Sequence, residues 1–400
     1  MAIATTVRAV NDLTARWADV SEGGTVFSAA GVWPLLAHLA DGADGAARAE
    51  LAEAIGLSAG QAAGASRELL ATMGTVQGLD AALGLWTKRT LKLREEWETA
   101  LPAHAHGLLT GDDESDHRTL DAWTAERTGG LIDRMPVDLE TRTRLVLASA
   151  LALRTEWQLP FRHEELTTAY GPWAGKPLLG LRRSGGATDE VAVADTSAGR
   201  VTEVKVLGNN DLDVHLLLGE EGMKPGRVLG AGLDILAGRC AAVPGPKLPH
   251  GNAGPGLRVE DVRCTRPEPP SLEVATAAFD MNESHDLRDR RQLFGLTTAM
   301  DTTVGHFSGI SDFPPLAVGS ARQNILARFR ALGFEAAAVT AINVVATSLP
   351  DLRYMTTRVS ATFDRPFGFL ALHRRTGLVL TAGWVTEPLP FTGYGRHDER

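Results

Sequence analysis

The chain lacks most of the features that mark a secreted, membrane-bound or nucleic-acid-binding protein. Only two of its 400 residues are cysteine, Cys240 and Cys264, which is too few for a disulfide scaffold. No stretch approaches the roughly 20 apolar residues of a membrane-spanning helix. The first residues lack the basic head and apolar run of a signal peptide. We therefore expect a cytoplasmic protein, with export as the open alternative.

A strong positive charge is also missing. Lys and Arg number 40 against 49 Asp and Glu, which gives a net charge of −9. Proteins that bind nucleic acid or anionic membranes concentrate basic charge, so neither is expected as a partner.

The sequence contains no recognisable catalytic motif. It has no G-x-S-x-G, S-x-x-K, G-x-x-x-x-G-K-[ST] or H-E-x-x-H. Residues 104–106 and 111–117 hold several potential metal ligands, but neither segment has a supporting second pair, so a solvated loop is favoured for each. Residues 163–165 are expected to form a surface turn rather than an acid–base pair. We predict no enzyme activity, no metal and no cofactor.

The pattern of apolar residues predicts an α+β fold. Three- and four-residue steps predict a helix over 7–20, and residues 27–57 predict two more, with Pro34 in a first helical turn. Residues 144–157 are densely apolar without a helical period, which is typical of a strand buried on both faces. Residues 244–270 are rich in Pro, Gly and charge and are expected to be loose. The C-terminal segment predicts successive strands, so helices precede strands along the chain.

Residues 333–349 form an unusual segment, in which a glycine is followed by small and then by β-branched side chains. Alternate positions from Phe334 to Val344 are almost wholly apolar, whereas the other parity carries Glu335 and Asn343. An ordinary core strand or buried helix is one interpretation. The other is an exposed loop that also inserts as a strand, because small side chains pass between strands at little steric cost.

Five blocks of the sequence resemble, in their order and spacing, the blocks of one known protein family: residues 27–57, 120–136, 144–161, 293–311 and 363–388. With them the chain resembles the serpins, as a divergent, bacterial-type member, from about residue 7 to about residue 388. The resemblance implies a single domain over 1–388, with helices packed on a large central sheet, smaller sheets, and an exposed reactive-centre loop at about 333–357. Residues 389–400 would be a disordered tail, and we expect a monomer.

The resemblance implies an inhibitor of serine proteases that acts as a suicide substrate. The protease cleaves the reactive-centre loop and forms an acyl-enzyme, and the freed loop then enters the main sheet as a new strand. The alternative function is that of a non-inhibitory serpin, which would act as a binding or chaperone module.

Residue by residue, the hinge of the loop matches Gly333, Phe334, Glu335, Ala336, Ala337 and Ala338. The family's scissile bond lies about fourteen residues beyond the hinge glycine, which places it between Thr347 and Ser348. A small threonine before the bond suits an elastase- or subtilisin-like protease. The bond between Arg353 and Tyr354 is a second candidate, and it would suit a trypsin-like enzyme.

Several positions depart from the family pattern. Phe334 replaces the usual Thr or Ser, and Ala331-Leu332 replaces a segment with an acidic residue. Burial of Phe334 would contribute roughly 1.5–3 kcal/mol, but its bulk would slow the first step of insertion.

The region where the sheet opens includes Trp157, which matches a family tryptophan. It also includes Ser149 and Gln323, where the family has Asn and His, beside Gly31, where the family has Ser. A hydrogen bond between Ser149 and Gln323 is expected to replace the family's pair.

Overall fold

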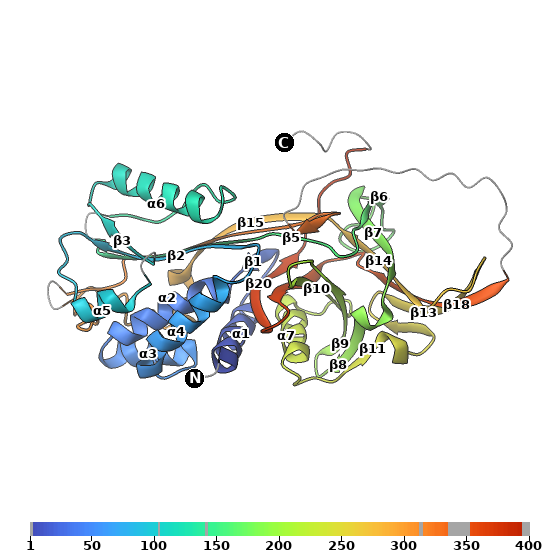
Figure 1. Cartoon of the computed structure of the whole chain (residues 1–400), viewed down its shortest axis with the longest axis horizontal. Helices are drawn as coiled ribbons and strands as arrows, with labels where there is room; N and C mark the ends of the chain where they lie inside the picture. Colours follow the sequence, from blue (N-terminus) through green and yellow to red (C-terminus); the bar gives the residue numbers. More distant parts are fainter. Residues whose placement is uncertain (1–2, 103–104, 141–142, 312–314, 335–352, 394–400) are drawn as a thin grey trace.

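The computed structural model describes residues 3–102, 105–140, 143–311, 315–334 and 353–393. Its centre is a seven-stranded main sheet with long strands in its middle and two-residue strands at one end (Figure 1). The strands in spatial order are β3 (His106–Leu109), β2 (Leu79–Lys88), β4 (Leu145–Leu153), β16 (Ser320–Phe329), β17 (Gly333–Phe334) and β5 (Thr155–Glu156), while β15 (Phe279–Asp286) pairs with the other side of β16.

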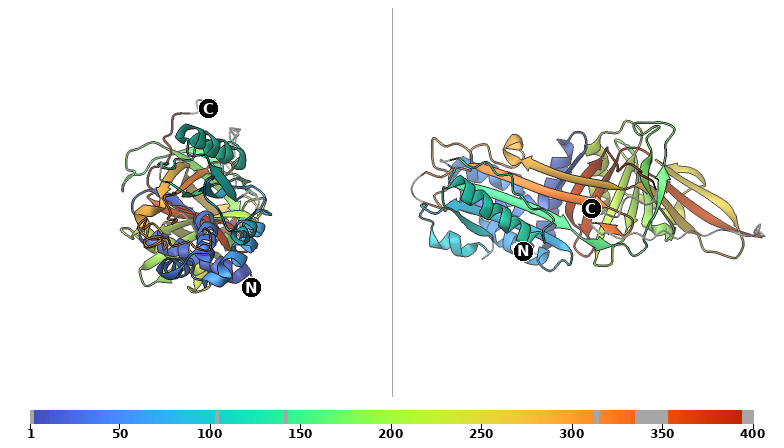
Figure 2. Two further views of the ribbon diagram at one scale, coloured as in Figure 1. Left: turned by 90° about the vertical axis from the view of Figure 1, so that its left-hand side faces the viewer. Right: turned by 90° about the horizontal axis from the view of Figure 1, so that it is seen from above.

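Helices cover both faces of this sheet. The helices of the described residues are α1 (Ile3–Asp19), α2 (Ala29–Gly42), α3 (Gly45–Ile55), α4 (Ala59–Met73), α5 (Glu95–Ala100), α6 (Asp113–Arg127) and α7 (Pro225–Leu236). α6 lies across one face and α2 packs against the other (Figures 1 and 2). Every residue of β4 is therefore buried, which confirms the prediction of a strand buried on both faces.

Helix α2 begins earlier than its proline suggests. The hydroxyl of Ser28 accepts a hydrogen bond from the Gly31 N–H, and this N-cap starts the helix at Ala29. Pro34 thus lies inside the helix and not in its first turn, which corrects the sequence-based expectation.

Two further sheets form the other half of the molecule. One has the order β1 (Thr25–Phe27), β20 (Leu378–Val385), β19 (Phe367–His373), β10 (Leu212–Gly219), β9 (Gly199–Val206), β8 (Val191–Thr196) and β11 (Ala242–Pro244). The other has the order β12 (Gly251–Gly254), β13 (Leu257–Cys264), β18 (Tyr354–Thr362), β14 (Ser271–Ala277), β7 (Leu178–Gly186) and β6 (Arg162–Leu166).

Three local expectations are corrected by these elements. The segment 244–270, expected to be loose, contains the hairpin of β12 and β13. Residues 163–165 belong to strand β6 and not to a turn, because each pairs with a residue of β7. The acidic segment 111–117 starts α6, where Asp112 caps the helix by accepting from the Ser115 N–H and its neighbouring carboxylates face the positive end of the helix dipole.

The first residues beyond Pro388 contact the rest of the domain. Leu389 donates its N–H to Ala278 at 2.8 Å, and Phe391 donates to Pro177 at 3.0 Å. Residues 389–391 are thus attached to the domain. The domain boundary expected at residue 388 remains a prediction. No helix among the described residues is both long and apolar enough to cross a membrane.

Candidate functional site at the opening of the main sheet

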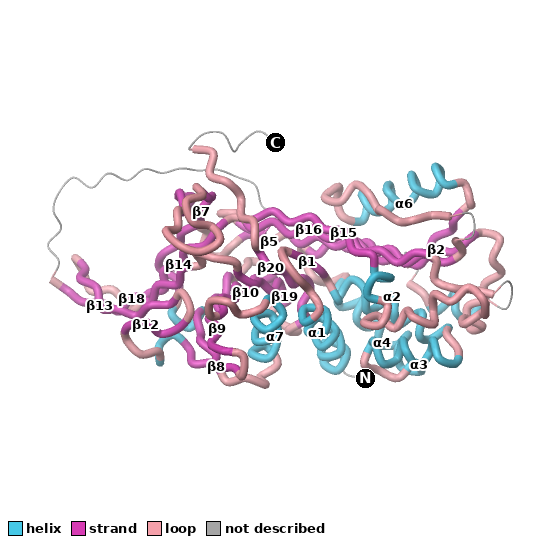
Figure 3. The backbone as a smooth tube through the Cα atoms, turned by 180° about the vertical axis from the view of Figure 1, so that it is seen from behind, coloured by secondary structure: helices cyan, strands magenta, loops and turns pink. Residues whose placement is uncertain are grey.

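The two central strands of the main sheet pair directly with each other over part of their length. β4 and β16 run parallel, with partners from Val146 opposite Ser320 to Leu151 opposite Ile325. We call this line of pairing the seam. Beyond Ile325 the two strands diverge, and Figure 3 shows β5 beside the end of β16. The sheet is therefore closed along the seam and open at one end.

The first two residues of the expected hinge, Gly333 and Phe334, lie at the beginning of this opening. Phe334 pairs with Phe329 of β16 on one side and with Thr155 of β5 on the other, and Gly333 pairs with Glu156. The Phe334 side chain is 1% exposed, and its ring lies 6.2 Å from that of Phe369. Phe334 is therefore buried in the uncleaved protein. Its bulk is already accommodated in a cluster of aromatic side chains.

The turn before the hinge is held by backbone hydrogen bonds. Trp157 donates its N–H to Leu332 at 2.8 Å and its indole Nε1–H to the Arg330 carbonyl at 2.9 Å. Phe161 donates to Ala331 at 2.8 Å. The acceptors are the backbone carbonyls of Ala331 and Leu332, so these two hydrogen bonds do not depend on the side chains at these positions. Trp157 therefore holds the turn that precedes Gly333, and its ring packs on Phe329 of β16 at 5.0 Å.

Beneath the seam, a buried polar cluster joins the sheet to the start of α2. Gln323 of β16 accepts from the Ser28 N–H at 2.9 Å and donates to the Ser28 carbonyl at 2.8 Å. The same amide donates to the Ser149 hydroxyl at 3.3 Å, so the hydrogen bond expected between these two residues is present. Gln323 and Ser149 are fully buried, and the three hydrogen bonds satisfy polar groups that water does not reach.

Gly31 makes room for this cluster. A Cβ atom at Gly31 would lie 2.8 Å from the Ser149 hydroxyl and 3.1 Å from the Gln323 amide nitrogen. The three departures from the family pattern therefore belong together, because the long Gln323 side chain occupies space that a serine at position 31 would need. The resemblance to the family identifies these three positions as departures. Only the structure shows that the small residue at position 31 compensates for the longer side chain at position 323.

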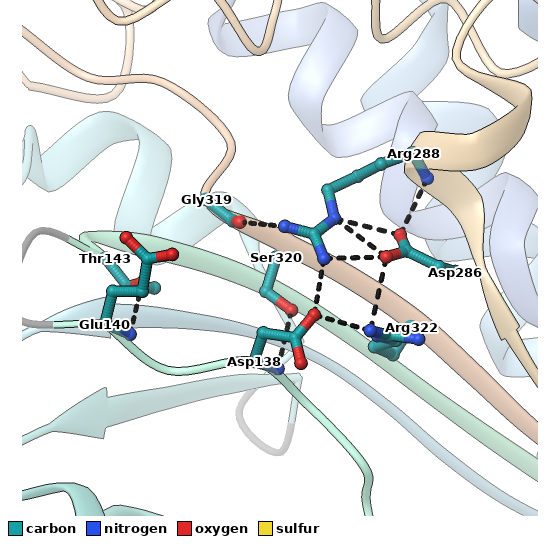
Figure 4. A network of polar contacts seen from close by, with 8 residues as sticks. All are labelled: Asp138, Glu140, Thr143, Asp286, Arg288, Gly319, Ser320 and Arg322. Carbon is teal, nitrogen blue, oxygen red and sulfur yellow. Dashed lines mark hydrogen bonds and ion pairs between the residues drawn. The ribbon is translucent and has the colours of Figure 1, made fainter.

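A segment between α6 and β4 crosses the opposite face of the seam. We call residues 128–140 the strap. At its start, Met135 donates its N–H to Asp121 of α6 at 2.8 Å. Near its end, the Asp138 carboxylate accepts from Arg322 of β16 and from Arg288, each at 2.5 Å (Figure 4). The strap is thus bound to α6 on one side and to β16 on the other.

Two carboxylates of this network are stabilised in their charged form. Hydrogen bonding and charge from Arg322 and Arg288 lower the pKa of Asp138. Burial alone would raise the pKa of Asp286, but hydrogen bonds from the Arg288 side chain and N–H outweigh it, so its pKa is also lowered. Arg288 lies in the short 3₁₀ helix Leu287–Arg290 that follows β15. No motif in the sequence points to these residues, since the contacts join segments about 150 residues or more apart.

The remaining expected site residues separate into two groups. Glu335, Ala336, Ala337, Ala338, Thr347 and Ser348 lie outside the described residues. Arg353 is exposed, and Tyr354 is the first residue of β18 and pairs with Cys264. Among the described residues, no group of three or more His, Cys, Asp or Glu side chains is placed to hold a metal ion.

Comparison with known proteins identifies the family. The family model of the serpins, serine protease inhibitors, matches residues 6–170 and 262–388. The chain belongs to the serpin family. This serpin is 24% identical over 397 residues to the putative serpin-Z6C of Oryza sativa subsp. japonica, covering 92% of this chain and 91% of the relative.

Other relatives agree with this assignment. The serpin is 26% identical over 273 residues to plasminogen activator inhibitor 1 of Sus scrofa, covering 66% of this chain and 60% of the relative. Its fold matches the native-state crystal structure of the thermophilic serpin Tengpin with a TM-score of 0.71 at 15% identity, covering 96% and 94% of the two chains. The α+β serpin fold is confirmed, and the family is one of protease inhibitors and not of enzymes. The two sequence relatives come from a plant and a mammal, so the expected bacterial type is not supported by them.

Proposed function

We propose that this serpin inhibits a serine-type endopeptidase as a suicide substrate. The protease serine attacks the carbonyl carbon of the scissile bond, the new amino terminus leaves, and an acyl-enzyme remains. The segment on the amino-terminal side of the bond then enters the seam between β4 and β16. The observation that carries this proposal is strand β17, because it places the start of that segment at the open end of the seam.

On this proposal, the inserting segment continues the register of β17 down the seam. Phe334 lies opposite Phe329, so continued antiparallel pairing brings residue 343 opposite Ser320 at the lower end of β16. Residues of the same parity as Phe334, including Ala336 and Ala338, then face the core, because successive side chains of a strand alternate between faces. The apolar parity noted in the sequence is the one that this register turns inward.

The opposite parity fits the outer face of the sheet. The same register brings Glu335 opposite Arg328, which is 36% exposed at its side chain and pairs with Asp280 at 3.1 Å. Opposite charges in directly facing positions stabilise a strand pair by roughly 0.2–1 kcal/mol. A charged residue at the first inserted position is therefore compatible with insertion.

Chain length favours the bond between Thr347 and Ser348. Cleavage there frees residues 335–347, which slightly exceeds the nine residues needed to reach Ser320. Cleavage between Arg353 and Tyr354 would leave a much longer segment. It would also require residues from Tyr354 onward to leave strand β18 and enter the protease cleft. We therefore propose an elastase- or subtilisin-like target rather than a trypsin-like one.

The test is to mix the purified serpin with elastase-like, subtilisin-like and trypsin-like serine proteases. We expect complexes that survive denaturing gels with one of the first two, and mass mapping of the released peptide should place the cut after Thr347. A paired substitution tests insertion itself. Ala336→Arg puts a charge on the inward parity and should convert the inhibitor into a substrate, whereas Ala337→Arg on the outward parity should retain inhibition.

Two results would contradict this mechanism. Cleavage of the loop with no stable complex for any of the proteases is one. The other is a melting temperature that does not rise after cleavage. Both together would favour the non-inhibitory function, in which the serpin acts as a binding or chaperone module.

A further inference from the structure

Strand β18, which follows the reactive-centre loop, is enclosed between two other strands. On one side it pairs in parallel with β14, from Arg358 opposite Ser271 to Thr362 opposite Ala275. On the other side it pairs with β13 along eight residues, from Tyr354 opposite Cys264 to Ala361 opposite Leu257. The first four residues of β18 pair with β13 alone among the described strands. Figure 1 shows β13 and β18 extending together at the end of the molecule away from α6.

The hairpin of β12 and β13, residues 251–264, is fastened to the body at its turn. Thr202 of β9 donates its hydroxyl to the Pro255 carbonyl at 2.7 Å, and Thr362 donates its N–H to Gly256 at 2.8 Å. Leu257 and Val259 of β13 are each 3% exposed and belong to the main hydrophobic core. The hairpin is therefore a packed part of the domain and not an appendage.

Polar contacts extend the attachment toward the far end of β18. Thr357 donates its hydroxyl to Asp261 of β13 at 2.9 Å, and His250 lies 3.2 Å from the same carboxylate. These contacts lie where β14 no longer pairs with β18. The hairpin thus holds the part of β18 closest to the loop.

The hairpin lies almost entirely in the part of the chain that the family model does not match. The match ends at residue 170 and resumes at residue 262, so β12 and most of β13 fall in the gap. The family match therefore does not cover the hairpin, and its attachment to β18 rests on the structure itself.

The length of the loop makes this attachment consequential. Nineteen residues, 335–353, join Phe334 to Tyr354. If the uncleaved loop filled the seam down to Ser320, nine of them would be used, and the other ten could span at most about 36 Å when fully extended. The return alone would take about 30 Å at 3.3 Å per residue. Figure 1 shows β18 extending toward the end of the molecule away from the main sheet, so the loop would have to reach farther still and this strand would have to leave its sheet.

We propose that the hairpin is a clamp that retains β18 and makes insertion of the loop conditional on its cleavage. The proposal rests on the proposed function, because it concerns the same insertion. An intact chain cannot release the carboxyl-terminal end of its loop while β13 holds β18. A cleaved chain needs no such release, since the scissile bond no longer connects the inserting segment to β18.

The test weakens the clamp without touching the loop. Val259→Pro removes an N–H from the middle of β13, and proline is poorly tolerated in an internal strand. A control for proline substitution as such is Val243→Pro in β11, an exposed edge position in another sheet, where β11 pairs with β8. Each protein is incubated at moderately elevated temperature, and uncleaved monomer with raised resistance to urea is measured, with mass spectrometry to confirm an intact chain. We expect conversion at least tenfold faster for Val259→Pro than for the wild type, and no acceleration for the control.

A second variant restores the clamp covalently. Because Tyr354 faces Cys264 across the two strands, Tyr354→Cys in the Val259→Pro background should form a disulfide that a reductant opens. Conversion should stop when the disulfide is closed and resume when it is reduced. Equal conversion in both redox states would overturn the proposal.

Hydrogen exchange of the wild type covers the case in which Val259→Pro does not fold. Those amides of residues 354–357 that donate to β13 should be protected comparably to the amides of 358–362. Rapid exchange of these β13-bonded amides alone would overturn the proposal. The cleaved wild type separates the two hypotheses. If cleavage raises its stability but Val259→Pro does not convert faster, the clamp is wrong and the proposed function stands. If cleavage leaves its stability unchanged, the proposed function fails first.

Discussion

Replacement of Phe334 by alanine tests whether the hinge is part of the native core. The Phe334 ring is 1% exposed, and its neighbours Phe329 and Phe369 are fully buried. Removal of the ring would leave a cavity bounded by strands β16 and β19, which are fixed by their own sheets and have little freedom to close it. We therefore expect Phe334→Ala to destabilise the uncleaved protein.

The size of the effect follows from the burial. Phe→Ala in a protein core typically costs about 3–5 kcal/mol. Unfolding entropy of about 2.1 cal/mol/K per residue, applied to this chain length, makes 1 kcal/mol worth roughly 1.2 °C. The melting temperature should therefore fall by about 4–6 °C. Phe334→Leu keeps most of the volume and should cost less than half as much.

The assay is thermal unfolding of the uncleaved wild type and the two variants, followed by circular dichroism at equal protein concentration and heating rate. The order of melting temperatures should be wild type, then Phe334→Leu, then Phe334→Ala. A melting temperature for Phe334→Ala within about 1 °C of the wild type would refute the reasoning. Such a result is expected only if the Phe334 side chain is exposed to solvent in the uncleaved protein, because removal of an exposed side chain costs little stability.

Three further substitutions test the site around the seam. Gln323→Leu leaves the buried Ser28 N–H without its acceptor, so urea denaturation should show a loss of about 1–3 kcal/mol in the free energy of unfolding; a loss below 0.5 kcal/mol would contradict a stabilising role of the polar cluster. Gly31→Ser crowds the same cluster and should also lower the free energy of unfolding. The double variant Gly31→Ser with Gln323→His should recover part of that loss, whereas strictly additive effects of the two substitutions would contradict steric compensation. Asp138→Asn weakens the attachment of the strap to β16, so the free energy of unfolding should fall by roughly 0.5–1 kcal/mol. If the strap opposes insertion of the loop, the fraction of serpin trapped in a protease complex should rise in a titration, and an unchanged fraction would exclude the strap as a barrier to insertion. Because folding lowers the pKa of Asp138, the ionised carboxylate stabilises the folded protein above the unfolded pKa of about 3.9, and this stabilisation is lost as the pH falls further. Urea unfolding midpoints measured from pH 6 to pH 3 should therefore fall more steeply for the wild type than for Asp138→Asn. Parallel curves for the two proteins would refute this.

Much of the main sheet was predictable because its signals are local. The apolar run over 144–157 predicted β4, since a strand covered on both faces cannot carry polar side chains. Alternation predicted that Phe334 turns inward, because strand geometry fixes the parity of neighbouring residues. Pro34 and residues 163–165 were misplaced for the opposite reason. The Ser28 cap and the partner strand β7 decided those elements, and neither is visible in the residues themselves.

The sequence by itself determined the family, the α+β class and the apolar parity of the segment that would insert. It did not determine the order of helices and strands, because β1, β2 and β3 precede α6 and α7 follows β10. Only the tertiary structure decided that β4 and β16 are paired along the seam, that Gly31 gives space to Gln323, that Asp138 ties the strap to Arg322, and that β13 encloses β18. The physical reason is distance along the chain. Periodicity and capping act over a few residues, whereas each of these contacts joins segments many residues apart whose pairing depends on how the whole domain packs.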